Sequence, residues 1–143
     1  MSSPIRVSAG LITRKGRVLI CQRRATDLHA SQWEFPGGKT HDGESEADCL
    51  RRELQEELQI HATIGAMLER TTHSYPNGRT VALTFFHVPA YSGEIVNMQF
   101  QKLTWASPEG LLSYDFLEGD RDFVARLVRG EWASLFAMPN VDH

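Results

Sequence analysis

The segment GGKTHDGESEADCLRRELQEELQI, residues 37–60, places a glycine pair and a polar loop directly before a strongly patterned helix. Ser45 is a favoured N-cap residue, and Asp48 follows three positions later, where a capping box has its second member. We therefore expect a helix over residues 46–58. At about 100° per residue, one face of this helix is apolar, formed by Ala47, Leu50, Leu54 and Leu58. That face has to be buried, which predicts a helix packed on a sheet.

A neighbouring face of the same helix carries three carboxylates. Glu53 stands three residues before Glu56 and four before Glu57, and like charges at these spacings repel by a few tenths of a kcal/mol per pair. Glu56 and Glu57 also lie near the helix C-terminus, where the macrodipole disfavours anions. A divalent cation would reverse this repulsion, and hard oxygen ligands suit Mg²⁺ or Mn²⁺. Helical spacing alone does not distinguish between two interpretations of these carboxylates, a solvated acidic face and a metal site.

The remaining patterns alternate between strand and helix. Strands are expected over residues 4–13, 18–22, 33–35, 62–73, 80–90 and 101–106. The strand at 33–35 should stop at Pro36, Gly37 and Gly38, and turns are expected at 14–17 and 75–78. An amphipathic helix is expected over 119–130. This mixture predicts an α/β sandwich with a mixed central sheet between helices.

Length and composition favour one folded domain over residues 1–143, with a tail at 131–143 that is short enough to fray. The formal net charge of −3 argues against nonspecific attraction to polymeric nucleic acid or to a membrane. No signal peptide is visible, and no run reaches the ~20 apolar residues that span a bilayer. Cys21 and Cys49 lie outside any metal-ligand spacing, which is typical of free thiols and favours the cytoplasm. Nothing in the sequence indicates the oligomeric state.

The segment at 38–60 also carries a family signature. Gly38, five residues, Glu44, seven residues and then RELQEELQI at 52–60 closely resemble the Nudix box. That box reads G-x5-E-x7-R-E-U-x-E-E-x-G-U, where U is a bulky aliphatic residue. All of its fixed positions match except the last glycine, where Gln59 stands. The preceding WEFPGGK is similar to the MutT-type branch, which includes 8-oxo-dGTP diphosphatases and CTP pyrophosphohydrolases.

This resemblance implies a Nudix fold, an α/β/α sandwich with a mixed central sheet and a loop–helix–loop catalytic motif. It also implies a bound Mg²⁺, with Mn²⁺ as an alternative. The implied ligands are the side chains of Glu53, Glu56 and Glu57 and the carbonyl of Gly38. Arg52 would orient a helix carboxylate, and Glu44 would brace Arg52 across the motif. Glu53 and Glu56 are the residues expected to matter most, but the identity of the general base stays open.

Two positions depart from the family pattern. Glycine at a helix end usually adopts the left-handed conformation, which Gln59 reaches only at a cost of about 1 kcal/mol. Gln99 lies six residues before Trp105, where MutT-type relatives often carry a loop glutamate that reaches the metals or the attacking water. Glutamine can coordinate through its carbonyl but cannot take a proton. We expect this second departure to affect the rate rather than the reaction type.

Several residues resemble substrate-contacting positions of MutT-type enzymes. Arg24 matches a position that contacts nucleotide, while Arg23 is as well explained as a solvated cation. Lys39 follows the glycine that is expected to bind metal, and His29 aligns with a substrate-lining position in a loop. Phe35 offers an apolar wall or a stacking surface for a base, with a core aromatic as the alternative. We expect a structural role for the two histidines in predicted strands, His73 and His87.

Asp120 is the most informative residue for specificity. It falls where MutT-type enzymes for oxidised guanine nucleotides carry asparagine and where the CTP pyrophosphohydrolase branch carries aspartate. An ionised carboxylate only accepts hydrogen bonds, so it suits the amino group of cytosine or the donors of a guanine edge. The alternative is a helix N-cap, which aspartate also favours.

The implied activity is hydrolysis of a nucleoside triphosphate by water, with Mg²⁺, to a monophosphate and pyrophosphate. The substrate would be an oxidised or noncanonical nucleotide such as 8-oxo-dGTP, or a pyrimidine nucleotide such as CTP or dCTP. Such an enzyme serves nucleotide pool sanitation and DNA repair. Two alternatives stay open: a nonhydrolytic nucleotide-binding or regulatory domain, and a hydrolase of conjugates such as ADP-ribose.

Overall fold

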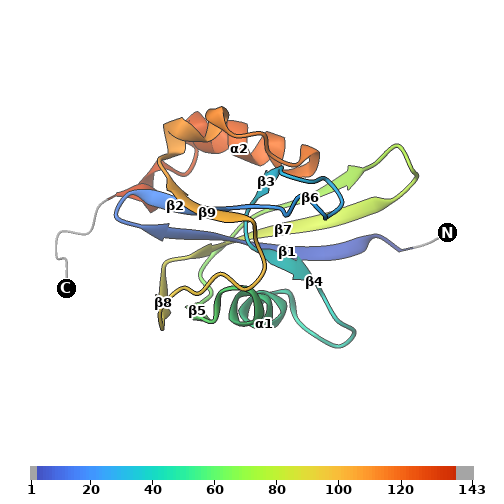
Figure 1. The fold of residues 1–143 in the computed structure, drawn as a ribbon, viewed down its shortest axis with the longest axis horizontal. Helices are drawn as coiled ribbons and strands as arrows, with labels where there is room; N and C mark the ends of the chain where they lie inside the picture. Colours follow the sequence, from blue (N-terminus) through green and yellow to red (C-terminus); the bar gives the residue numbers. More distant parts are fainter. Residues whose placement is uncertain (1–2, 138–143) are drawn as a thin grey trace.

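The computed structural model describes residues 3–137, which form a mixed sheet with helices on both sides (Figure 1). Its strands are β1 (Ile5–Arg14), β2 (Arg17–Gln22), β3 (Trp33–Glu34), β4 (Gly37–Lys39), β5 (His61–Thr63), β6 (Met67–Ser74), β7 (Thr80–Val88), β8 (Ala90–Ser92) and β9 (Lys102–Ala106). The main sheet has the order β3-β2-β1-β7-β6, with β4 paired to β1 and β9 to β2. β1 and β7 run parallel and the other pairs antiparallel, which confirms the predicted mixed sheet.

The helices lie on opposite faces of this sheet. Figure 1 shows α1 (Glu46–Leu58) on one side and α2 (Arg121–Val128) on the other. Neighbouring residues of β1 therefore serve different cores: Leu11 packs in the cluster that includes α2, and Ile12 in the cluster that includes α1. Phe85 and Phe86 of β7 are divided in the same way. Both faces of these strands are covered, so residues 8–12 of β1 and 83–86 of β7 are buried consecutively.

Two strands predicted as continuous are each divided in the structure. The predicted strand at 62–73 becomes β5 and β6, with Gly65 between them donating its N–H to the carbonyl of His87 at 2.7 Å. The predicted strand at 80–90 ends as β7 before Pro89, which has no N–H to donate to a ladder. Beyond these breaks, β5 and β8 pair with each other in a separate two-stranded sheet. The breaks let the chain leave the main sheet and pass beside α1.

The glycine pair was expected to stop a strand, but it forms β4 against β1. Ser8 lies opposite Gly38 in this ladder, and a Cβ on Gly37 would lie 2.0 Å from the Ser8 carbonyl oxygen. Only glycine permits such a close approach of the two backbones. The pairing therefore fixes the start of the loop that leads to α1.

The chain after the last strand covers the second face of the sheet. It passes through the 3₁₀ segments η1 (Pro108–Ser113) and η2 (Glu118–Asp120), then α2 and η3 (Ala133–Phe136). Trp132, Leu135 and Phe136 pack partly buried against the core cluster on the α2 side. The rest of the tail predicted to fray, residues 138–143, lies outside the described residues. No helix within residues 3–137 is long and apolar enough to cross a membrane.

Candidate active site

The helix α1 forms as its sequence predicts. The Ser45 side chain accepts a hydrogen bond from the Asp48 backbone N–H at 3.1 Å, which caps the first turn. The residues buried on its inner face are Cys49, Leu50, Leu54 and Leu58. At the other end, the amides of Val96 and Met98 donate to the carbonyls of Leu58 and Glu57, both at 2.9 Å. These bonds satisfy helix-terminal carbonyls and hold the loop before β9 against the end of α1.

The helix ends at Gln59, which adopts the expected left-handed conformation with φ 59° and ψ 34°. We expect Gln59→Gly to raise the free energy of unfolding by about 1 kcal/mol, because glycine adopts this conformation without a Cβ penalty. Urea unfolding would measure the change. Gln55→Gly, at an exposed position inside the same helix, is the matched control and should lower stability by about 1 kcal/mol. No gain from Gln59→Gly would mean that the side chain carries stabilising contacts.

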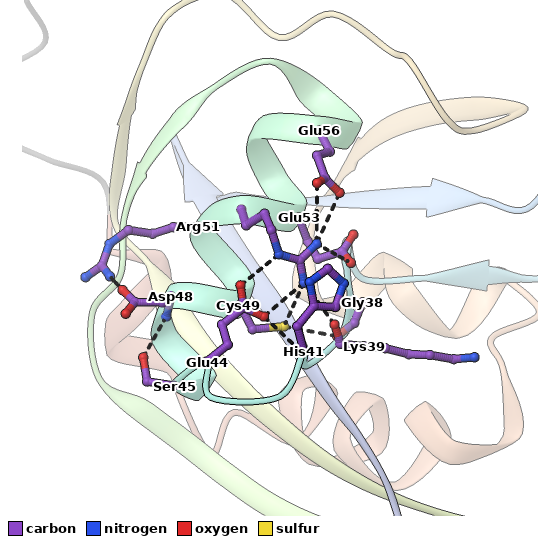
Figure 2. A network of polar contacts seen from close by, with 11 residues as sticks. Gly38, Lys39, His41, Glu44, Ser45, Asp48, Cys49, Arg51, Glu53 and Glu56 are labelled. Atoms are coloured by element: carbon purple, nitrogen blue, oxygen red, sulfur yellow. Dashed lines mark hydrogen bonds and ion pairs between the residues drawn. The ribbon is translucent and has the colours of Figure 1, made fainter.

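Arg52 is the centre of a polar network at the helix, and Figure 2 shows its partners Glu44, Glu53 and Glu56. Its Nε and Nη2 donate to the two carboxylate oxygens of Glu44 at 2.8 and 3.0 Å, and Nη2 also donates to the Lys39 carbonyl. Its Nη1 donates to Glu53 and Glu56, each at 3.2 Å. The guanidinium lowers the pKa of Glu44 to about 2, so the pair is fully charged at neutral pH. Arg52 thus ties the glycine loop to the carboxylate face of α1.

Glu57 is the most perturbed carboxylate of this face. Burial raises its pKa to about 9, and the charges of Glu53 and Glu34 add to the effect. The Gly37 N–H donates to Glu57 at 3.2 Å, which offsets part of this cost. Burial likewise raises the pKa of Glu53, although Arg52 opposes the shift. The pKa of both carboxylates stays above its usual range, so the positive charge around them does not offset their burial.

A hard divalent cation would supply further positive charge. Within residues 3–137, no three His, Cys, Asp or Glu side chains converge closely enough to hold a metal as they stand. In this arrangement Arg52 donates to Glu53 and Glu56, while Glu57 accepts from the Gly37 amide. The chemistry of the donors still fits Mg²⁺ or Mn²⁺, because all are oxygens. The Gly38 carbonyl, which the family resemblance implies as a further ligand, accepts a hydrogen bond from the Cys49 thiol at 3.4 Å.

A pocket of about 580 Å³ lies beside the carboxylate face. Its lining includes, among the residues expected from the sequence, His29, Phe35, Gly38, Lys39, Glu57, Gln99 and Asp120. Within residues 3–137, Arg23 lines this pocket and Arg24 does not. The Arg24 guanidinium instead donates to the Met98 carbonyl at 3.4 Å. Arg23 binds the Glu34 carboxylate at 3.1 Å and the Leu28 carbonyl at 2.8 Å, which fixes the loop that carries His29.

Asp120 is one of the residues that line this pocket. It stands at the N-cap of α2, yet its side chain makes no capping hydrogen bond with the described residues. The residue is only 6% exposed and accepts a hydrogen bond from the Phe35 backbone. Burial raises its pKa well above the usual range, with a further contribution from the charge of Glu34. The alternative function as a helix cap is therefore not what the side chain performs.

Several lining residues were missed by sequence reasoning. Tyr75 lies in the turn between β6 and β7, which was read only as a turn signal, and His73 was expected to be structural. Glu34 alternates with two buried aromatic residues on its strand, a pattern that signals a side chain on the other side of the strand. The parallel pairing of β1 and β7 brings these distant segments together, and local patterns do not reveal it.

A mixed sheet between helices, with a carboxylate-bearing helix beside a pocket, defines an α/β/α sandwich with a candidate active site. The NUDIX domain model matches residues 3–127, and the chain belongs to the Nudix hydrolase family.

Within this family, the chain is similar to two named relatives and to two solved structures. The chain is 40% identical over 116 residues to a CTP pyrophosphohydrolase of Escherichia coli K12, covering 81% of this chain and 85% of the relative. It is 32% identical over 126 residues to an 8-oxo-dGTP diphosphatase of the same organism, covering 87% and 97%. The solution structure of the E. coli ORF135 protein matches with TM-score 0.80 and 36% identity, covering 90% and 91%. A MutT structure, from work on Aliivibrio salmonicida and Vibrio cholerae, matches with TM-score 0.76 and 26% identity, covering 89% and 98%.

Proposed function

We propose that this Nudix hydrolase is a Mg²⁺-dependent nucleoside triphosphate pyrophosphohydrolase, which releases a nucleoside monophosphate and pyrophosphate. The proposal rests mainly on one observation. Glu57, on the carboxylate face of α1, and Asp120 line the same pocket of about 580 Å³. The names of the relatives, a CTP pyrophosphohydrolase and an 8-oxo-dGTP diphosphatase, support the same reaction. Product analysis tests it, because this cleavage yields pyrophosphate rather than phosphate and should stop when a chelator is added.

The residues divide the work as follows. Glu53, Glu56, Glu57 and the Gly38 carbonyl would hold the cation. A bound Mg²⁺ would neutralise phosphate charge and polarise the phosphoryl oxygens. Arg52, braced by Glu44, keeps Glu53 and Glu56 aligned along the helix. Lys39 and Arg23 line the pocket and offer further positive charge to the phosphates. A box glutamate takes the proton of the attacking water, since Gln99 cannot.

Asp120 would read the base, and its replacement should change substrate choice. We expect Asp120→Asn to shift the ratio of kcat/KM for 8-oxo-dGTP over dCTP by about tenfold in favour of 8-oxo-dGTP, because an amide both donates and accepts. Steady-state kinetics on both nucleotides would measure the ratio. Asp122→Asn, whose carboxylate is 87% exposed two residues further on, is the matched control. An unchanged ratio in Asp120→Asn would remove this residue from base recognition.

We further propose that residues 1–143 act as one domain in the cytoplasm. The helix, the pocket and the sheet are joined through two continuous cores, which supports a single folding unit. Cys21 and Cys49 are both buried free thiols, as is usual in a reducing compartment.

A further inference from the structure

The part of the pocket around Asp120 is walled by the end of β6 and by the chain that enters α2. His73 and Tyr75 contact each other edge to face, with ring centroids 4.5 Å apart, and both line the pocket. Gly119, the residue before Asp120, packs against this pair: a Cβ there would lie 3.3 Å from the Tyr75 hydroxyl and 3.8 Å from His73. The Gly119 N–H also donates to that hydroxyl. His73, Tyr75 and Gly119 therefore line the same part of the pocket as Asp120, and burial together with the charge of Asp120 raises the pKa of the Tyr75 hydroxyl.

The imidazole has an unused polar atom. Nε2 of His73 is buried and has no hydrogen-bond partner within residues 3–137. The nearest charged group is the Glu118 carboxylate at 3.8 Å, which is too far for a hydrogen bond. A buried nitrogen without a partner is unfavourable, so a leucine or phenylalanine would serve the fold equally well. His73 differs here from His87, whose Nε2 lies 2.8 Å from the Thr13 hydroxyl.

We propose that His73 and Asp120 together recognise the nucleobase. Asp120 accepts a hydrogen bond from the base, and the Nε2–H of His73 donates to the neighbouring acceptor atom of the base. This inference rests on the proposed function and adds a donor to its recognition site. A carboxylate beside an N–H donor complements a base edge that presents a donor beside an acceptor. Cytosine offers its amino group beside ring N3, and guanine offers its N1–H beside O6. The imidazole therefore makes the pocket sensitive to the acceptor atom of the base, which Asp120 alone cannot detect.

Analogues that lack or weaken the acceptor test this directly. Steady-state kinetics would compare CTP with 3-deaza-CTP, which lacks N3 but keeps the amino group, and dGTP with 6-thio-dGTP, in which a weakly accepting sulfur replaces O6 while N1–H is kept. For the base that the protein prefers, the wild type should favour the intact nucleotide by about tenfold in kcat/KM, mainly through KM. His73→Phe keeps an aromatic ring against Tyr75 but removes both nitrogens. It should lose this preference, lowering kcat/KM for the intact nucleotide about tenfold.

Two further variants keep the test decisive. His73→Gln returns an N–H donor at similar reach and should restore most of the preference. His61→Phe, at an exposed position on β5, is the matched control and should behave as the wild type. If His73→Phe retains the wild-type preference, or if His73→Gln loses it as fully as His73→Phe, the inference is wrong while the proposed function stands. If the folded wild type hydrolyses neither these four nucleotides nor 8-oxo-dGTP, dCTP or 5-methyl-dCTP, the proposed function fails first and takes this inference with it.

Discussion

Glu53→Gln and Glu57→Gln should each lower kcat by at least about 100-fold in the presence of Mg²⁺, while the protein stays folded. Glutamine keeps the shape of the side chain but removes the charge that would bind the cation and the capacity to take a proton. Pyrophosphate release would measure the rate, and circular dichroism would check the fold. Glu109→Gln, exposed on η1, is the matched control and should keep the wild-type rate. Half of the wild-type rate or more in Glu53→Gln would exclude this face from the chemistry.

Glu57→Gln, which should lower activity, should not lower the stability of the metal-free protein. The pKa of Glu57 is raised from 4.5 to about 9, so the folded state binds more protons than the unfolded state between these values. The free energy of unfolding contributed by this group therefore falls as pH rises from about 4.5 to 9 in metal-free protein. Glu57→Gln should remove this loss, so its melting temperature in chelator at pH 8 should match or exceed that of the wild type. A lower melting temperature would indicate that the carboxylate stabilises the fold.

The second large effect is expected from Gly38→Ala, which should lower kcat by about 100-fold. A Cβ on Gly38 would lie 2.4 Å from the carboxylate of Glu53, so that carboxylate has to leave its present position, in which it accepts a hydrogen bond from Arg52. The measurement is again pyrophosphate release with Mg²⁺. Gly130→Ala is the control, because it places a side chain at φ 87° but lies after α2, away from the carboxylate helix. It should cost stability and leave kcat unchanged, whereas normal activity in Gly38→Ala would show that Glu53 tolerates displacement.

The sequence was most informative where local signals agreed with one another. The bounds of α1 were predicted correctly because the Ser45 cap and the apolar face specify the same helix. The left-handed conformation of Gln59 followed from its place in the box. The pairing of Arg52 with Glu44 was expected from the family resemblance, and the structure contains that contact. In each case the interacting residues lie within a few turns of chain.

The rest depended on contacts between distant segments. β4 forms because the backbone of β1 approaches a glycine closely, and the local pattern signalled only a strand end. Sequence similarity assigned nucleotide contact to Arg24, while the pocket is lined by Arg23, a neighbour on the same loop. His73 and Tyr75 line the pocket because β6 pairs with β7 and its end packs against the chain entering α2. The sequence around these two residues does not indicate either contact. Such placements are set by tertiary packing rather than by propensity.

Product analysis on a nucleotide panel tests the central claim most directly. Pyrophosphate and phosphate would be measured separately for 8-oxo-dGTP, dGTP, dCTP, CTP, 5-methyl-dCTP and ADP-ribose, with Mg²⁺ and with chelator. We expect pyrophosphate release from at least one triphosphate that stops on chelation and is lost in Glu53→Gln. Release of phosphate alone, turnover that continues in chelator, or no turnover of any triphosphate by folded protein would contradict a metal-dependent pyrophosphohydrolase.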